Sequence, residues 1–247
     1  IWRMSLDRGH PSSLLNTVRS ATSNARELRE YISPESGSIL TGIDLKLTDL
    51  ARQSPTSRNQ PARDKRNELA TRALRFVHTE INACLASTAR TMLQDAGWHF
   101  LEIGKQIERA TLTADTLLHV LTGAATASII RARSGSSTFR DNPELSALLR
   151  MLGSQDAYRR LYHRRSQPLL VAQLLIQQTN APRSILHNLR EISQNLQGIH
   201  ESARGSHSTL LQNELHHRIT KITTLNLAPF FTEHPAGPKE NGLEGVL

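Results

Sequence analysis

Apolar residues recur every three or four positions along the first part of the chain, which is the spacing of an amphipathic helix. The first such run follows Pro11 and two serines, a helix-start signal, and ends before the turn-forming segment 33–37. A second, shorter helix is expected over about 39–50. No stretch alternates with period two, the pattern of a half-buried strand, so the sequence predicts an all-α fold, a multi-helix bundle.

Longer helical patterns follow, over about 68–95 and from Gly97 onward, and shorter ones continue to residue 227. Between them, residues 51–67 contain two prolines, five basic residues against one acid and no large apolar residue, which predicts a mobile linker. The last residues, 229–247, are rich in proline and glycine and are expected to form a tail. We therefore expect a single helical domain over residues 1–228.

The helix that begins at Gly97 has apolar residues on two nearly opposite sides. One stripe contains Phe100, Ile103, Gly104, Ile107, Ala110, Thr111, Ala114 and Leu118, and the other contains Trp98, Leu101 and Leu112. A helix that is apolar on two sides is usually packed from two sides, so we expect it near the centre of the bundle. Glu108 and Arg109 stand side by side at its middle and point in directions about 100° apart.

Two segments 171 residues apart resemble each other, which predicts an internal pseudo-repeat or two helices that share a start signal by accident. The identical pairs are Pro11/Pro182, Ser13/Ser184, Leu15/Leu186, Arg19/Arg190, Asn24/Asn195 and Glu30/Glu201.

Composition adds little to this picture. The net charge is +8, but 25 of the 30 basic residues are arginines spread along the chain, so an anionic partner is only weakly indicated. Cys84 is the single cysteine, which rules out an intrachain disulfide and makes the cytoplasm the expected location. The longest apolar stretch, 117–130, is too short and polar to cross a membrane. The first residue is not methionine, so we expect an incomplete N-terminus.

Candidate chemistry is sparse. Glu108 and Arg109 either pair with charges on neighbouring helices or line a polar cavity. Arg159, Arg160 and Arg164 either bind an anion or form a solvated face. His99 and Glu102 share a helical face without further metal donors, so no metal site is expected. We find no phosphate loop and no catalytic motif, and expect no cofactor.

Several motifs, taken together, resemble those of the bacterial alpha-E family, a helical domain named for its Glu-Arg motif. The pattern Trp98-x-Phe100-x3-Gly104-x3-Glu108-Arg109-Ala110 resembles the family signature, and "NARELREYIS", with Asn24, Arg26 and Arg29, is similar to another family segment. The resemblance implies a domain encoded beside, or fused to, a circularly permuted ATP-grasp ligase and a transglutaminase-like protein. It also implies a similar Glu-Arg helix near the start of the natural protein.

The resemblance thus suggests a non-catalytic helical partner in bacterial amide or peptide-bond synthesis. Two alternatives stay open: an enzyme or ligand-binding bundle with a polar Glu/Arg cavity, and an arginine-rich nucleic-acid binder, which lacks aromatic interleaving. A homo-oligomer is also open. We expect Glu108 to pair with Arg26 or Arg29 from another helix, since an unpaired buried carboxylate is costly. If the pseudo-repeat is a duplication, the counterpart of the Glu-Arg helix lies upstream of Ile1, and its docking surface is left exposed and apolar.

Overall fold

The computed structural model describes residues 1–57, 59–133, 143–203 and 209–231. All regular elements within these ranges are helical, which confirms the all-α prediction. The chain forms two compact units, Ile1–Gln94 and Asp95–Leu247, and each has its own apolar core. The sequence predicted one domain with one core; the break at Met92–Asp95, between two long helices, was not recognised as a unit boundary.

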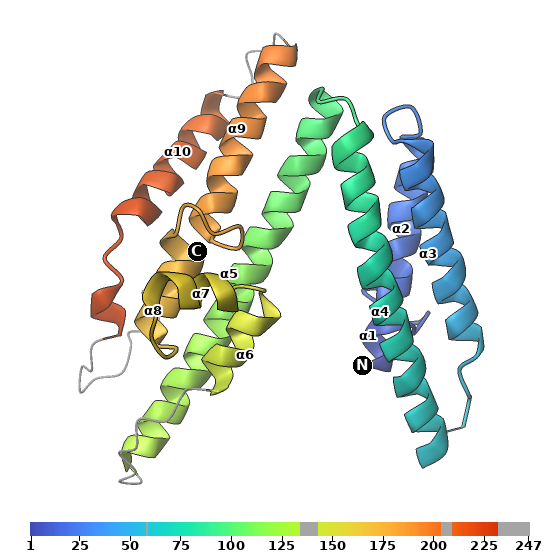
Figure 1. The fold of residues 1–247 in the computed structure, drawn as a ribbon, viewed down its shortest axis with the longest axis horizontal. Coiled ribbons are helices and arrows are strands. Elements are labelled where there is room, and N and C mark those ends of the chain that lie inside the picture. The colour runs from blue at the N-terminus through green and yellow to red at the C-terminus, as the bar shows by residue number, and fades with distance from the viewer. Residues whose placement is uncertain (58, 134–142, 204–208, 232–247) are drawn as a thin grey trace. The chain divides into compact units, whose positions relative to one another are not determined.

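The first unit is built from α1 (Trp2–Ser5), α2 (Leu14–Glu27), α3 (Pro34–Arg52) and α4 (Gln60–Thr91). Helix α3 packs against both α2 and α4, as Figure 1 shows. Its core is made by the buried faces of these helices: Leu6, Leu15, Val18, Ile43, Leu47, Leu50, Leu69, Ala73 and Val77. The three- and four-residue spacing of these positions is what the amphipathic pattern predicted.

The linker prediction for residues 51–67 is wrong over most of its length. Helix α3 continues to Arg52 and α4 already begins at Gln60, so the connection is short. Asn59 caps α4 by accepting a hydrogen bond from the backbone N–H of Ala62 at 3.1 Å. Pro61 lies in the first turn, where its missing N–H costs nothing. Arg66 donates to the carbonyl oxygens of Pro55 and Ser57 and fastens the connection to α4.

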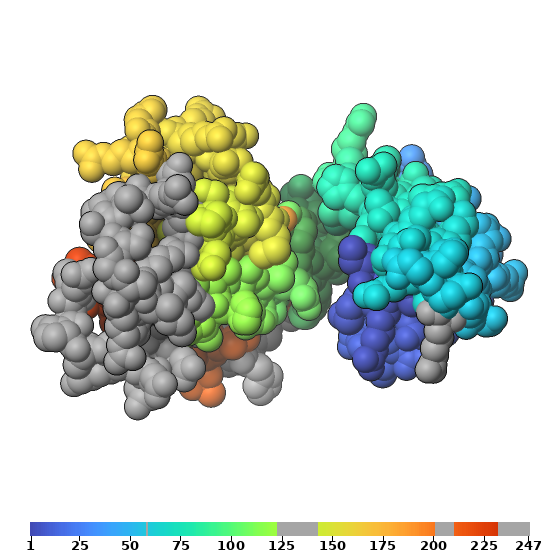
Figure 2. Space-filling view, turned by 90° about the horizontal axis from the view of Figure 1, so that it is seen from below, coloured from blue at the N-terminus to red at the C-terminus, as the bar shows by residue number. Residues whose placement is uncertain are grey.

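The second unit contains α5 (Ala96–Arg133), α6 (Pro143–Met151), α7 (Gln155–Tyr162), α8 (Pro168–Ala172), the π-helical turn η1 (Gln173–Gln177), α9 (Ile185–Ala203), α10 (Thr209–Thr224) and the 3₁₀ turn η3 (Ala228–Phe230). Helix α9 runs antiparallel along α5, and α10 packs on α9 (Figure 1). The residues of α6 lie directly against α5 (Figure 2). Phe230 and Phe231 pack on this core, so the expected tail is attached at its beginning; residues 232–247 lie outside the described ranges.

A glycine of α9 faces a histidine of α5. A Cβ atom added to Gly198 would lie 2.3 Å from the ring of His99, so a larger residue there would require the ring or the helix to move. The ring of His99 is held by Asn195, whose Oδ1 lies 2.9 Å from Nδ1 of the histidine. Further along the same face of α5, Gln106 and Thr113 are buried. The contact between the two helices is therefore partly polar.

The prediction that α5 is packed from two apolar sides is wrong for its first turns. Phe100, Leu101, Ile107 and Leu112 are 63, 43, 48 and 52% exposed, whereas the polar Gln106 and Thr113 are 4 and 0% exposed. Helix α9 packs along α5 and contacts it at His99, seven residues before Gln106. The four exposed apolar residues therefore form a surface, a case that periodicity does not distinguish from a core position.

The two segments of the pseudo-repeat begin their helices in the same way. The backbone N–H of Ser13 donates to the carbonyl oxygen of His10 at 3.0 Å, and that of Ser184 donates to Ala181 at 2.8 Å. Both serines are fully buried, and the backbone carbonyl oxygen of each serine accepts the first hydrogen bond of its helix. Each helix then packs on the next helix of its unit, α2 on α3 and α9 on α10. The serine side chains differ, because Oγ of Ser13 accepts from the Asn16 N–H whereas that of Ser184 donates to the Ile176 carbonyl oxygen. The shared backbone geometry fits a repeat and a shared start signal equally, so the pseudo-repeat stays a prediction.

Candidate functional site

The residues singled out from the sequence are divided between the two units. Asn24 and Arg26 lie on the last turn of α2 and Arg29 just after it, all three exposed. Trp98, Gly104, Glu108 and Arg109 lie on α5. A pair formed by Glu108 with Arg26 or Arg29 would join the two units, and it stays a prediction.

Arg26 and Arg29 lie on a groove between α2 and α3 with a volume of about 560 Å³. Its lining contains these two arginines, no acidic residue, and a mixture of hydroxyl and apolar side chains: Thr22, Ala25, Ile32, Ser33, Pro34, Ser38, Thr41 and Leu45, with Gly37 and Gly42. Among the described residues, neither arginine forms an ion pair. Within the described residues, the groove therefore offers two guanidinium groups without an ion-pair partner beside hydroxyl and apolar side chains, a combination suited to an acidic, partly apolar partner.

Gly37 and Gly42, on the α3 side of the groove, were not recognised from the sequence. A Cβ added to either would meet no atom within 4 Å, so the fold of this unit does not require a glycine at these positions. A glycine inside a helix costs about 0.5–1 kcal/mol relative to alanine. Two such residues facing one groove leave the backbone of α3 open to close approach by another molecule. The sequence signal was present, as two glycines five residues apart in an otherwise amphipathic run.

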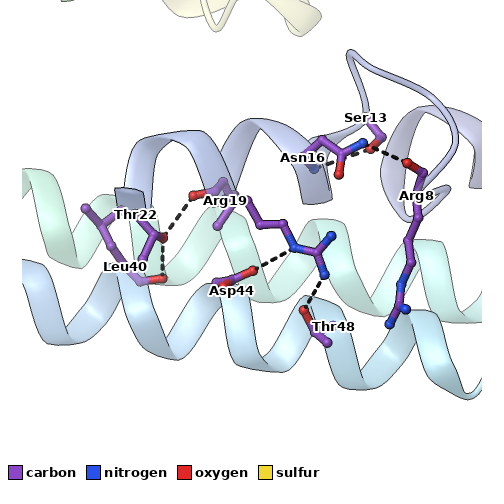
Figure 3. A network of polar contacts seen from close by, with 9 residues as sticks. Arg8, Ser13, Asn16, Arg19, Thr22, Leu40, Asp44 and Thr48 are labelled. Atoms are coloured by element: carbon purple, nitrogen blue, oxygen red, sulfur yellow. Dashed lines mark hydrogen bonds and ion pairs between the residues drawn. The ribbon is translucent and has the colours of Figure 1, made fainter. Parts of the chain in front are cut away.

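A polar network fixes α2 against α3 next to the groove (Figure 3). Arg19 forms an ion pair with Asp44, with Nε and Oδ1 3.5 Å apart, and donates a hydrogen bond to Oγ1 of Thr48 at 3.2 Å. The Thr22 hydroxyl lies 2.9 Å from the Val18 carbonyl oxygen and 3.3 Å from that of Leu40. The charge of Arg19 is thus used within the unit, unlike those of Arg26 and Arg29.

The Glu-Arg motif itself lies on the surface of α5. Glu108 is exposed and forms no ion pair among the described residues, so the expectation of a buried carboxylate is wrong. One turn earlier, Lys105 forms an ion pair with Glu102. Arg109 is half-buried on the flank that leads to Arg183. Burial lowers the pKa of Arg183, and the positive charge of Arg109 lowers this pKa further, so the two cations lie near each other.

The arginine-rich segment forms an exposed surface. Arg159, Arg160 and Arg164 are all exposed, and Nη1 of Arg159 lies 3.9 Å from the carboxylate of Asp156. The chain turns just after α7, where His163 adopts a left-handed conformation with φ of 49°. Tyr158 closes this turn by donating to the Arg165 carbonyl oxygen at 2.8 Å and accepting from the Gln167 N–H at 3.1 Å. These contacts favour a solvated face over an enclosed anion site.

The described residues hold no group of three or more metal-ligating side chains. His99 and Glu102, the pair weighed as metal ligands, instead contact Asn195 and Lys105. Cys84 is buried near Ser36 and Thr88, and burial raises the pKa of its thiol, which is the opposite of what a nucleophilic cysteine needs. Over the part of the chain that the structure describes, no helix is long and apolar enough to span a membrane.

Comparison with known proteins assigns the chain to a family. The sequence profile of Alpha-E, an α-helical domain with a conserved ER motif, matches residues 1–244, and the chain belongs to this family. Glu108 and Arg109 are the one adjacent Glu-Arg pair in the sequence. No solved structure matches the chain.

Uncharacterized proteins of Mycobacterium bovis and Mycobacterium tuberculosis are 22% identical to the chain over 223 residues. The match covers 90% of this chain and 23% of the relatives. The chain thus spans less than a quarter of the length of the curated relatives it matches.

Proposed function

We propose that the protein is a non-catalytic helical partner in a bacterial amide- or peptide-ligase system of the ATP-grasp type. The observation that carries the proposal is the α2–α3 groove, whose unpaired arginines and open glycines fit a protein segment better than a small reactive substrate. The ATP site and the chemistry would then reside on the partner. Such a role places the protein in the cytoplasm, where ATP is available.

One further observation supports this role. The mycobacterial relatives carry the similar region within a much longer chain, as expected for a domain that acts beside others.

The groove also specifies the kind of segment that would bind. Its arginines lie on the α2 side and its glycines on α3, so a helix or extended strand lying between them would place acidic side chains toward Arg26 and Arg29. Apolar side chains of the same segment would contact Ala25 and Leu45, of which Leu45 is 65% exposed. We therefore expect an acidic, amphipathic segment of the ligase-type partner.

Co-expression with the ATP-grasp and transglutaminase-like proteins that the family resemblance implies as neighbours tests the proposal. We expect a stable complex with one of them, weakened at least about tenfold by Arg26→Glu with Arg29→Glu. Gly42→Leu should weaken it as well by narrowing the groove, since an added Cβ at this position meets no atom of the free protein within 4 Å. The control is Arg72→Glu with Arg75→Glu on the exposed face of α4, outside the groove.

No complex with either neighbour, or a complex that tolerates the groove variants as well as the control, would refute the proposed role. Circular dichroism of each variant establishes that it remains folded, so that lost binding is not mistaken for unfolding.

A further inference from the structure

One side of α5 carries a row of four side chains in the order leucine, cation, anion, leucine. Read in the reverse direction, the row has the same order except that the cation and the anion have changed places. Leu101, Lys105, Glu108 and Leu112 follow each other at intervals of four, three and four residues, which places them in one row along a helix. Leucines stand at both ends, and one cation and one anion stand between them. A stripe of this kind is complementary to its own antiparallel copy.

From this complementarity we propose that two copies of the chain associate through α5, antiparallel, about a two-fold axis between Gln106 and Ile107. In this register Leu101 of each protomer lies opposite Leu112 of the partner subunit. Lys105 of each lies opposite Glu108 of the partner subunit. A two-fold interface requires every contact to occur twice, and this stripe supplies both copies of each contact.

The exposure of the stripe supports this occupant. Leu101 and Leu112 are 43 and 52% exposed, and Phe100 and Ile107 beside them are 63 and 48% exposed, so the face gains apolar burial on pairing. On the same flank, Gly104 and Thr111 are small. A Cβ added to Gly104 would meet nothing within 4 Å, so the backbone is open to close approach. The row repeats with an average spacing of about 3.7 residues, close to the turn of a straight helix, so the four side chains stay on one side of α5 along its length.

The charges at the centre explain why the pair would be antiparallel. In a parallel pair, Glu108 would face Glu108 and Lys105 would face Lys105, and like charges that meet in an interface are repelled. In the antiparallel pair each meets its opposite. Lys105, which contacts Glu102 on its own helix, would then lie between two carboxylates. The pairing gives a role to Glu108, the exposed acid of the motif. This role does not depend on the groove in the first unit.

Sedimentation equilibrium of the chain between about 1 and about 100 μM tests the association. We expect a reversible rise in mass from 27.5 kDa towards twice that value. Lys105→Glu or Glu108→Lys alone should weaken the dimer at least about tenfold, because each places two pairs of like charges in the interface. The double variant Lys105→Glu with Glu108→Lys restores the complementarity and should recover most of the affinity. Lys65→Glu on the exposed start of α4 is the control for net charge.

Disulfide trapping tests the register, in a Cys84→Ala background. In the antiparallel pair, Leu101 lies about 16 Å along the axis from Leu101 of the partner subunit, too far for a disulfide. Leu101→Cys and Leu112→Cys proteins should therefore cross-link when mixed and not when oxidised separately. A monomer at every concentration, a double variant that fails to recover, or cross-linking of Leu101→Cys with itself would each overturn the proposal.

Discussion

The ring of His99 occupies the space between α5 and α9 that any side chain at position 198 would need. It is fixed there by Asn195, one of the residues of the pseudo-repeat. Neither relation could be predicted from the sequence, where His99 suggested at most a metal ligand and Gly198 suggested nothing. Both contacts depend on which face of α5 meets α9. The periodicity of the sequence indicates two apolar faces on α5 and does not show that the polar face between them is buried.

Gly198→Ala is expected to destabilise the second unit by about 1–3 kcal/mol, because the added methyl group overlaps the histidine ring and either the ring or the helix must move. Chemical denaturation followed by circular dichroism measures the effect. The matched control is Gly104→Ala, on the open face of α5, which should raise stability slightly. Equal effects at the two glycines would contradict the close approach.

Thr113 is fully buried, and its hydroxyl has no hydrogen-bond partner among the described residues. Thr113→Val keeps the shape and removes the unsatisfied group, so we expect the free energy of unfolding to rise by about 1 kcal/mol. Urea denaturation provides the measurement. Thr116→Val is the control, since the Thr116 hydroxyl bonds to the Leu112 carbonyl oxygen at 2.6 Å and should gain nothing.

The thiol of Cys84 should react slowly with a disulfide reagent in the native protein. Burial raises its pKa, so at neutral pH the fraction of the reactive thiolate is smaller than in an ordinary cysteine. The reaction should accelerate with pH only above the usual thiol range, and it should become fast at once when the chain is unfolded. A native rate at neutral pH equal to the unfolded rate would contradict this interpretation.

At the scale of elements, the sequence predicted those helices whose apolar face is buried, such as α2 and α9. It failed at α4, whose first turns carry few apolar residues and which begins within the expected linker. What starts α4 is local: the Asn59 cap, Pro61 in the first turn and the bonds from Arg66 back to the connection. The capping residues are visible in the sequence, but the charged residues and prolines around them are also typical of a linker.

Asn59→Ala should destabilise the first unit by about 1 kcal/mol, because the amide N–H of Ala62 loses its partner at the start of α4. Thermal unfolding monitored by circular dichroism gives the change. Asn59→Asp preserves the acceptor and should remain close to the parent protein, which distinguishes loss of the cap from any change at this position. A stable Asn59→Ala variant would mean that the first turns of α4 contribute little.

At the scale of the whole molecule, two separate cores account for most of the buried apolar residues of the described chain. The all-α class and the family were predicted from the sequence, but the division into two units was not. The Glu-Arg motif illustrates the same limit. Its helix was identified correctly, yet the exposure of Glu108 depends on which neighbours cover α5, and this information lies in packing rather than in the motif.

Because each unit has its own core, residues 1–94 expressed alone should fold into a helical domain with a cooperative thermal transition. Circular dichroism and amide hydrogen exchange provide the measurements, with protection expected around Leu47 and Leu69, which are fully buried. A fragment that is helical but melts without cooperativity would show that the first core is insufficient by itself.

The open glycines at positions 37, 42 and 104 have a consequence for how the family should diverge. Nothing within either unit opposes a methyl group at these sites, and alanine would favour the helix at each of them. If the proposed partner segment and the proposed second copy occupy these surfaces, a lineage that has lost one of them should accumulate alanine or larger residues at the glycine concerned, with no cost to folding. The glycines facing the groove and the one on α5 should then be lost independently, each with the gene of its own partner or with the ability to self-associate. Genomes that retain the domain without its neighbours would record this as a change of residue at 37 and 42 alone.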